Sequence, residues 1–247
     1  IGYNRFNELL DGARNMDLHF RNTHFSENIP VLMACLSIWY NNFFNFQTHA
    51  IVPYSENLKS FSKYLQQASM ESNGKQTDRC GNLINYETGQ IIWGQTGTNA
   101  QHSFFQLLHQ GSKIIPSDFI GFKNSIKGNE DHHNILMANF FAQTKALMKG
   151  TNDEVIETKH KLFKGDRPTN TILINKLTPR TLGSLISMYE HKIFTLGILW
   201  NIYSFDQFGV ELGKKLAKNI LYDIENQDFG SHDSSTKNLL NKYLSTE

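Results

Sequence analysis

The sequence predicts an α/β fold in which a mainly parallel sheet is covered by helices on both faces. Short runs of apolar and β-branched residues alternate with longer segments whose apolar residues recur at helical spacing. Strands of a parallel sheet are buried on both faces, so they appear as continuous apolar runs. With 247 residues, the chain can bury a large core in one or two domains.

The expected strands lie at residues 49–53, 91–93, 113–120 and 171–176. Helical periodicity predicts helices at residues 4–16, 30–44, 57–67, 99–110, 132–148, 179–199, 207–226 and 233–243. Ser26 and Asn28 precede Pro30, which is tolerated in a first helical turn, so a helix is expected to start there. Beyond about residue 206 we expect a helical arm.

Composition excludes several classes of protein. Lys and Arg number 24 against 23 Asp and Glu, a net charge of +1 that argues against a broad nucleic-acid footprint. The longest apolar stretch, residues 29–40, is too short to cross a bilayer, so no membrane association is expected. Cys35 and Cys80 have no metal-ligand spacing and suggest a reducing, cytoplasmic location.

The segment MESNGK at residues 70–75 contains the first candidate functional residue, Glu71. A glutamate in such a turn-rich sequence is most often a solvated loop carboxylate. The following Ser-Asn-Gly makes the backbone tight and polar enough to hold a carboxylate in a pocket. Gln67 is expected to end the preceding helix as a surface amide.

A second segment, residues 92–111, places His102 near the predicted start of a helix marked by Thr98 and Asn99. The positive end of a helix disfavours protonation of a histidine and offers N–H groups to an anion. His102, Gln106 and His109 would share one helix face. The plainer interpretation is a helix-face histidine bonded to a neighbour, and no carboxylate or thiolate completes a zinc site.

A third segment, residues 204–214, carries Gln207 and Lys214. Gly209 and Gly213 stand in a helical pattern, where each costs about 1 kcal/mol relative to alanine. Such a cost indicates close approach by another helix or a ligand. Taken alone, Lys214 is most simply a surface lysine.

Taken in order, these segments resemble the glucose-6-phosphate isomerase family across essentially the whole chain. The motifs are Q-x-x-M-E-S-N-G-K at 67–75, W-G-x-x-G-T-N-x-Q-H-S-F-x-Q-L-x-H-Q-G at 93–111, and S-F-D-Q-x-G-V-E-L-G-K at 204–214. Residues 167–170, 188–194 and 231–236 add support. The resemblance implies a three-layer α-β-α sugar isomerase (SIS) domain over residues 1–205 and a C-terminal helical arm over 206–247.

The resemblance also implies an activity: interconversion of glucose 6-phosphate and fructose 6-phosphate in glycolysis and gluconeogenesis, without metal or cofactor. Glu71 matches the base that moves a proton between carbons 1 and 2 through a cis-enediol. His102 matches the histidine that assists ring opening and is donated to the partner subunit of a homodimer. Lys214 matches the lysine near the ring oxygen, and Gln67 and Gln207 match amides that contact the substrate.

Departures from the family pattern avoid these residues. Gln95 and Thr96 replace a common Glu-Pro, Tyr203 a common Asn, and Phe208 a usual Trp. The resemblance implies an N-terminal SIS domain with a phosphate loop and an arginine that this sequence does not contain. We therefore expect a C-terminal fragment that is inactive alone. A catalytically dead sugar-phosphate sensor is the alternative, but retention of Glu71, His102 and Lys214 together favours an enzyme.

Overall fold

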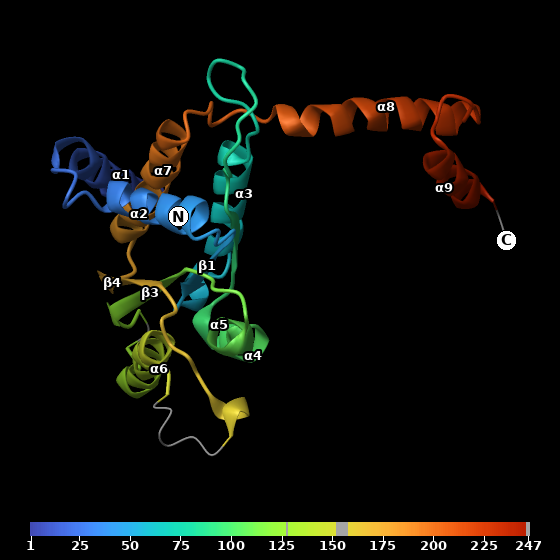
Figure 1. Ribbon diagram of the computed structural model, residues 1–247. Coiled ribbons are helices and arrows are strands. Elements are labelled where there is room, and N and C mark those ends of the chain that lie inside the picture. The colour runs from blue at the N-terminus through green and yellow to red at the C-terminus, as the bar shows by residue number, and fades with distance from the viewer. Residues whose placement is uncertain (127, 152–157, 246–247) are drawn as a thin grey trace. The chain divides into compact units, whose positions relative to one another are not determined.

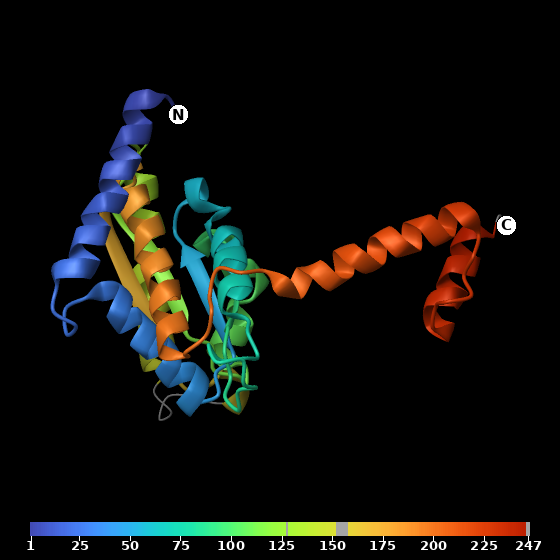
Figure 2. The ribbon, with the colours of Figure 1, turned by 90° about the horizontal axis from the view of Figure 1, so that it is seen from above.

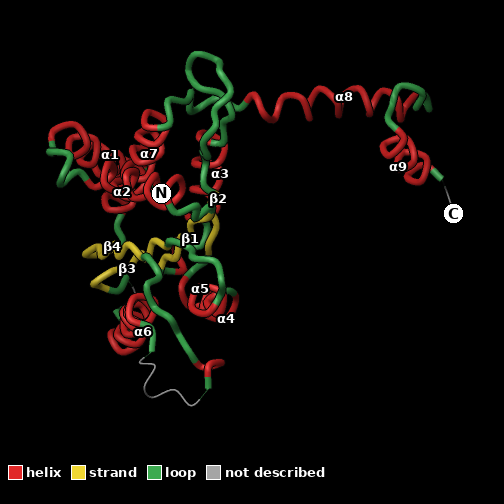
Figure 3. The backbone as a smooth tube through the Cα atoms, viewed as in Figure 1, coloured by secondary structure: helices red, strands yellow, loops and turns green. Residues whose placement is uncertain are grey.

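The computed structural model describes residues 1–126, 128–151 and 158–245. The chain divides into two compact units, Ile1–Phe205 and Asp206–Glu247. The first unit contains a sheet between two layers of helices (Figures 1 and 3). The predicted α/β architecture is confirmed.

The sheet consists of β1 (Thr48–Pro53), β2 (Ile91–Gly94), β3 (Ser117–Asn124) and β4 (Thr169–Lys176). All neighbours pair in parallel, in the order β2-β1-β3-β4. β3 begins later than the predicted 113–120 because Pro116, just before it, has no N–H to donate to a ladder. It then continues to Asn124, so the predicted end at residue 120 is too early.

Helices cover both faces of this sheet (Figures 1 and 2). One face is covered by α1 (Tyr3–Asn22), α2 (Ile29–Ile38), α3 (Phe61–Asn73) and α7 (Pro179–Leu199). The other is covered by α4 (Gly97–Ser103), α5 (Phe105–Gln110) and α6 (Glu130–Lys149). Short 3-10 turns lie at Glu56–Leu58 (η2) and Lys159–Lys161 (η4).

Two apolar clusters form because successive strand residues point to opposite faces. Ile51 and Ile120 pack with residues of α3 and α7, such as Leu65 and Leu185. Their strand neighbours Val52 and Phe119 pack on the other face, with Phe105 and Phe140. The sheet is therefore the shared wall of both halves of the core.

Several predicted helix boundaries are wrong. The helix expected over 4–16 continues to Asn22. The helix expected over 30–44 changes at Trp39 into a π-helical turn, η1 (Trp39–Phe43). The helix expected over 99–110 is broken at Phe104, whose backbone (φ −135°, ψ 2°) is not helical and whose ring packs edge-on against Trp93. The helix expected to end at residue 67 runs on to Asn73, so Glu71 lies on a helix instead of in a loop.

The second unit is helical. It contains η5 (Phe208–Val210), α8 (Glu211–Asn226) and α9 (Ser234–Leu244), the last capped by Asp233, whose carboxylate accepts from two backbone N–H groups. Every residue of α8 is at least partly exposed. Across the residues that the structure describes, no helix has the length and apolarity needed to span a bilayer.

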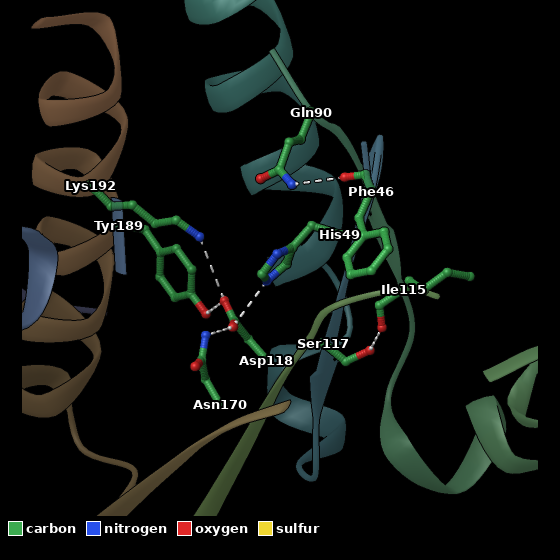
Figure 4. A network of polar contacts seen from close by, with 9 residues as sticks. All are labelled: Phe46, His49, Gln90, Ile115, Ser117, Asp118, Asn170, Tyr189 and Lys192. Atoms are coloured by element: carbon green, nitrogen blue, oxygen red, sulfur yellow. Dashed lines mark hydrogen bonds and ion pairs between the residues drawn. The ribbon is translucent and has the colours of Figure 1, made fainter. Parts of the chain in front are cut away.

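A buried cluster of polar groups joins the sheet to α7 (Figure 4). The Asp118 carboxylate on β3 accepts hydrogen bonds from Asn170 Nδ2 (2.7 Å) and Tyr189 Oη (2.9 Å). His49 Nε2 lies 3.0 Å from it and Lys192 Nζ 3.9 Å away. Asp118 has no exposed surface, so each charge here depends on its partners.

The charges in this cluster stabilise one another. Burial alone would raise the pKa of Asp118, but the charges of His49 and Lys192 and the hydrogen bond from Asn170 hold it well below its usual range. Burial lowers the pKa of Lys192, and the charge of Asp118 offsets part of that effect. Burial, with the Asp118 charge beside it, raises the pKa of Tyr189 well above its usual value, so the phenol remains a donor.

Replacing Asp118 by Asn is expected to destabilise the fold strongly, because the buried Lys192 would lose its counter-charge and His49 would lose the carboxylate 3.0 Å from its ring. The free energy of unfolding, measured by urea denaturation, should fall by about 3–5 kcal/mol. Asp11→Asn is the control, since the pair of Asp11 with Arg180 is 3.0 Å long but about half exposed. It should cost less than about 1 kcal/mol, and equal losses in the two variants would contradict the assignment.

Acid should weaken the fold through the same carboxylate. The folded-state pKa of Asp118 lies below its unfolded value of about 3.9, so its stabilisation is present above that pH and is lost as the pH falls below it. Between about pH 5 and about pH 3 the wild type should lose more unfolding free energy than Asp118→Asn. Urea titrations at constant ionic strength measure this difference, and parallel pH curves would rule it out.

Candidate functional site

A cavity of about 710 Å³ opens between α3 and α7. Its walls come from α1, α3, α7 and the end of the first unit. The lining includes Phe20, Tyr64, Gln67, Ala68, Glu71, Ser72, Glu190, His191, Phe194 and Phe205. Two of the residues singled out from the sequence, Gln67 and Glu71, are therefore brought together here.

Their proximity follows from the extension of α3. Gln67 and Glu71 are four residues apart on one helix, so their side chains lie one above the other. Both are exposed, whereas Leu65 and Ser69 on the opposite side are buried. The buried side fixes the helix against the sheet, and the exposed side presents an amide and a carboxylate to the cavity.

The opposite wall belongs to α7 and is bonded to α3. Tyr64 Oη donates to Glu190 Oε1 at 2.7 Å. Burial, together with the hydrogen bond to Glu190 and its charge, raises the pKa of Tyr64, so the phenol keeps its proton and remains the donor. This bond spans the cavity rim one turn before Gln67.

A third wall comes from α1, which packs closely on α7. A Cβ at Gly183 would overlap the carbonyl oxygen of Leu9, so the two backbones nearly touch. This approach brings Asp17 Oδ1 to 2.8 Å from His191 Nε2 and stacks the Phe20 ring on the imidazole, with 4.2 Å between centroids.

Asp17 is held ionised beside this histidine. Its burial opposes ionisation, but hydrogen bonds from Ser187 and His191 and the charges of His191 and Arg21 lower its pKa. Ser187 Oγ donates to the same Oδ1 atom at 2.8 Å. The carboxylate therefore fixes the orientation of His191 at the cavity wall.

His102 lies elsewhere. It is exposed in the last turn of the seven-residue α4, and the cavity lining does not include it. The prediction that it stands at a helix start is wrong, because α4 already begins at Gly97 and ends at Ser103. The predicted shared face with Gln106 and His109 is wrong as well. The break at Phe104 buries His109, which bonds to Gln143, while Gln106 stays exposed.

The tryptophan-glycine motif that precedes His102 lines a different cavity of about 600 Å³ at the end of β2. Its lining includes Trp93, Gly94, Gln95, Thr96 and Asn99, with Lys59 and Lys63 from the other side. Gln95 and Thr96, which depart from the family pattern, both line this cavity, with Gln95 exposed and Thr96 buried.

Gln207 and Lys214 belong to the second unit. Gln207 precedes η5, Lys214 lies in the first turn of α8, and both side chains are exposed. Within the described part of the chain, a Cβ at Gly209 or Gly213 would meet no atom within 4 Å. Among the described residues of the second unit, therefore, no other segment makes the close approach expected at these glycines.

Sequence reasoning missed Tyr64, Glu190 and His191. Tyr64 precedes Gln67 by three residues and Glu71 by seven, which is helical spacing. If the predicted helix had been extended past residue 67, this spacing would have placed Tyr64 on the same face as both residues. Glu190 and His191 entered only as part of a supporting motif. Their role depends on contacts with Tyr64 and Asp17, 126 and 174 residues away along the chain, which no local pattern reveals.

Comparison with known proteins gives a consistent result. The family profile described as "Phosphoglucose isomerase" matches residues 1–240. A glucose-6-phosphate isomerase of Christiangramia forsetii is 54% identical over 99% of this chain, which covers 48% of that protein. A crystal structure of a glucose-6-phosphate isomerase from Chlamydia trachomatis superposes with a TM-score of 0.88 at 41% identity, covering 98% of this chain and 46% of that one.

A more distant structure, a hypothetical protein of Thermus thermophilus, superposes with a TM-score of 0.68 at 24% identity over 87% of this chain and 50% of that one. At that identity the likeness concerns the fold alone. The chain spans about half the length of the relatives that it matches. The family profile covers residues 1–240, and the cavity between α3 and α7 is lined by residues of the motifs described above, such as Gln67 and Glu71. The chain therefore belongs to the phosphoglucose isomerase family.

Proposed function

We propose that this chain supplies the proton-transferring part of an isomerase that interconverts glucose 6-phosphate and fructose 6-phosphate. The observation that carries the proposal is the placement of Gln67 and Glu71 on one face of α3, inside a cavity of about 710 Å³. Membership of the phosphoglucose isomerase family supplies the substrate class.

The residue types suit the reaction. A proton next to a sugar carbonyl is weakly acidic, so its removal requires a base held at a fixed position and donors for the enediolate oxygens. Glu71 on a packed helix meets the first requirement: its carboxylate takes the proton from one carbon and returns it to the next on the same face. A positioned general base contributes about 10²–10⁴-fold to such a step. Gln67, one turn earlier, can donate an amide hydrogen bond to a substrate oxygen.

The remaining roles rest on the family resemblance. Lys214 exchanges a proton with the ring oxygen, and Gln207 contacts the substrate. His102, exposed on α4, assists ring opening in the site of a partner subunit within a cytoplasmic homodimer. Its exposure and its absence from the lining of the α3–α7 cavity support donation to another copy.

Replacing Glu71 by Gln tests the base. In a polypeptide of the relatives' full length that contains this chain, kcat should fall by at least about 10²-fold, while KM changes little because the shape of the side chain is kept. Exchange of the carbon-2 hydrogen with solvent deuterium, followed by NMR, should fall with it. Glu8→Gln on the exposed side of α1 is the control.

One result of this test would exclude Glu71 as the base, and another would exclude the enzyme assignment. Exchange at the wild-type rate in Glu71→Gln would show that Glu71 is not the base. If the unmodified protein binds sugar phosphates but exchanges no hydrogen, the sensor alternative replaces the enzyme.

Mixing two inactive variants tests the donation of His102 across subunits. Glu71→Gln and His102→Gln subunits are each inactive as homodimers, but a mixed dimer contains one site with both native residues. Equal co-expression should restore about a quarter of the wild-type activity, since half the dimers are mixed and one site in each is intact. If the mixture stays as inactive as its components, His102 does not act on the partner's site.

A further inference from the structure

The last turn of α3 is tied to two other segments by one buried side-chain amide. Asn73, two residues after Glu71, has no exposed surface. Its Nδ2 donates to the carbonyl oxygen of Ile193 on α7 at 3.0 Å, and its Oδ1 accepts from Ser204 Oγ at 2.6 Å. The amide thus joins the end of α3 to α7 and to the chain that follows α7.

The surroundings leave little freedom at this junction. A Cβ at Gly197 would overlap Ser204 Oγ, so the glycine on α7 makes the room that the hydroxyl occupies. A Cβ at Gly89 would lie 2.8 Å from the backbone oxygen of Asn73. Gly89 therefore lies close to the backbone of Asn73, and Gly197 lies close to the hydroxyl that the amide binds.

The residue after Ser204 belongs to the cavity. Phe205 lines it together with Glu71 and has a backbone φ of 67°, a left-handed conformation that side-chain-bearing residues seldom adopt. Such a conformation persists where neighbouring contacts hold it, and it is frequent at functional sites. Here the adjacent contact is the bond from Ser204 to Asn73.

We propose that Asn73 and Ser204 are positioning residues that set the Glu71 carboxylate relative to the Phe205 wall of the cavity. The inference deepens the proposed isomerase function and rests on it. Only about half a turn of α3 separates Asn73 from Glu71, so a displacement of Asn73 moves Glu71 as well. Ser204 is also the first residue of the third sequence motif, so the anchor holds the start of that motif.

This role differs from general support of the fold. The first turns of α3 are held by buried apolar residues such as Phe61 and Leu65, whereas its last turn depends on polar contacts. Loss of the Ser204 bond should free that turn and leave the core in place. A misplacement of about 1 Å at a reacting group can cost about 10²-fold in rate.

The test uses the full-length polypeptide and begins with Ser204→Ala. This change removes the hydroxyl and nothing else from the junction. We expect kcat to fall by about 10- to 100-fold, with little change in KM and in the melting temperature. The matched control is Ser184→Ala, which removes a 2.7 Å bond from α7 to the carbonyl oxygen of Gly12, away from the cavity. The control should keep the wild-type kcat.

Gly197→Ala provides a second variant that displaces the Ser204 hydroxyl without deleting it. It should reproduce the kinetic effect of Ser204→Ala. The two changes combined should cost no more than either alone, because they break the same contact. Wild-type kcat in Ser204→Ala, or simple multiplication of the two losses in the double variant, would overturn the proposal.

A measurement without substrate separates this inference from the proposed function. Hydrogen–deuterium exchange, read by mass spectrometry, should accelerate at residues 70–75 and 203–206 in Ser204→Ala and stay unchanged in Ser184→Ala. Unchanged exchange at both segments would show that the junction does not hold them. Failure of Glu71→Gln to reduce turnover, with accelerated exchange in Ser204→Ala, would instead reject Glu71 as the base and keep the junction.

Discussion

The carboxylate of Asp118, buried without exposed surface, sets the position of α7 on the sheet. Withdrawing an ionised group from water costs several kcal/mol unless partners surround it with good geometry. Its partners come from β1, β4 and α7, so the contact is satisfied only when α7 lies at one height and one rotation. Apolar contacts alone would allow α7 to slide or turn by small amounts. The hydrogen bonds and ion pairs of Asp118 do not allow such movement.

The same turn of α7 builds the cavity. Tyr189 and Lys192 are three residues apart and face the sheet, while Glu190 and His191 between them face the cavity. Fixing the first pair therefore orients the second pair. Glu190 in turn binds Tyr64 on α3, whose exposed face carries Gln67 and Glu71. A chain of contacts thus runs from the centre of the sheet to the residue proposed as the base.

Sequence reasoning predicted the order of strands and helices well because apolar periodicity is a local property. The motifs also selected Gln67 and Glu71, which the structure brings into one cavity. The prediction of helix boundaries from sequence failed where contacts with distant residues determine the local structure. The turn-like Ser-Asn-Gly after Glu71 is helical up to Asn73, since that amide is bonded to residues 120 and 131 positions away. The helix through His102 stops at Phe104, whose ring packs on Trp93 of β2.

The position of the junction explains why the helix that carries the proposed base ends in polar residues. An apolar residue in place of Asn73 would fill the space but would remove the second donor to the Ile193 carbonyl and the acceptor of the Ser204 hydroxyl. A carboxylate there would meet the carbonyl oxygen of Ile193 with no proton to offer. Only an amide donates on one side and accepts on the other. The Ser-Asn-Gly sequence, which looks like a solvated turn, is a buried junction. Its polar amide binds Ile193 on α7 and Ser204 in the segment after α7.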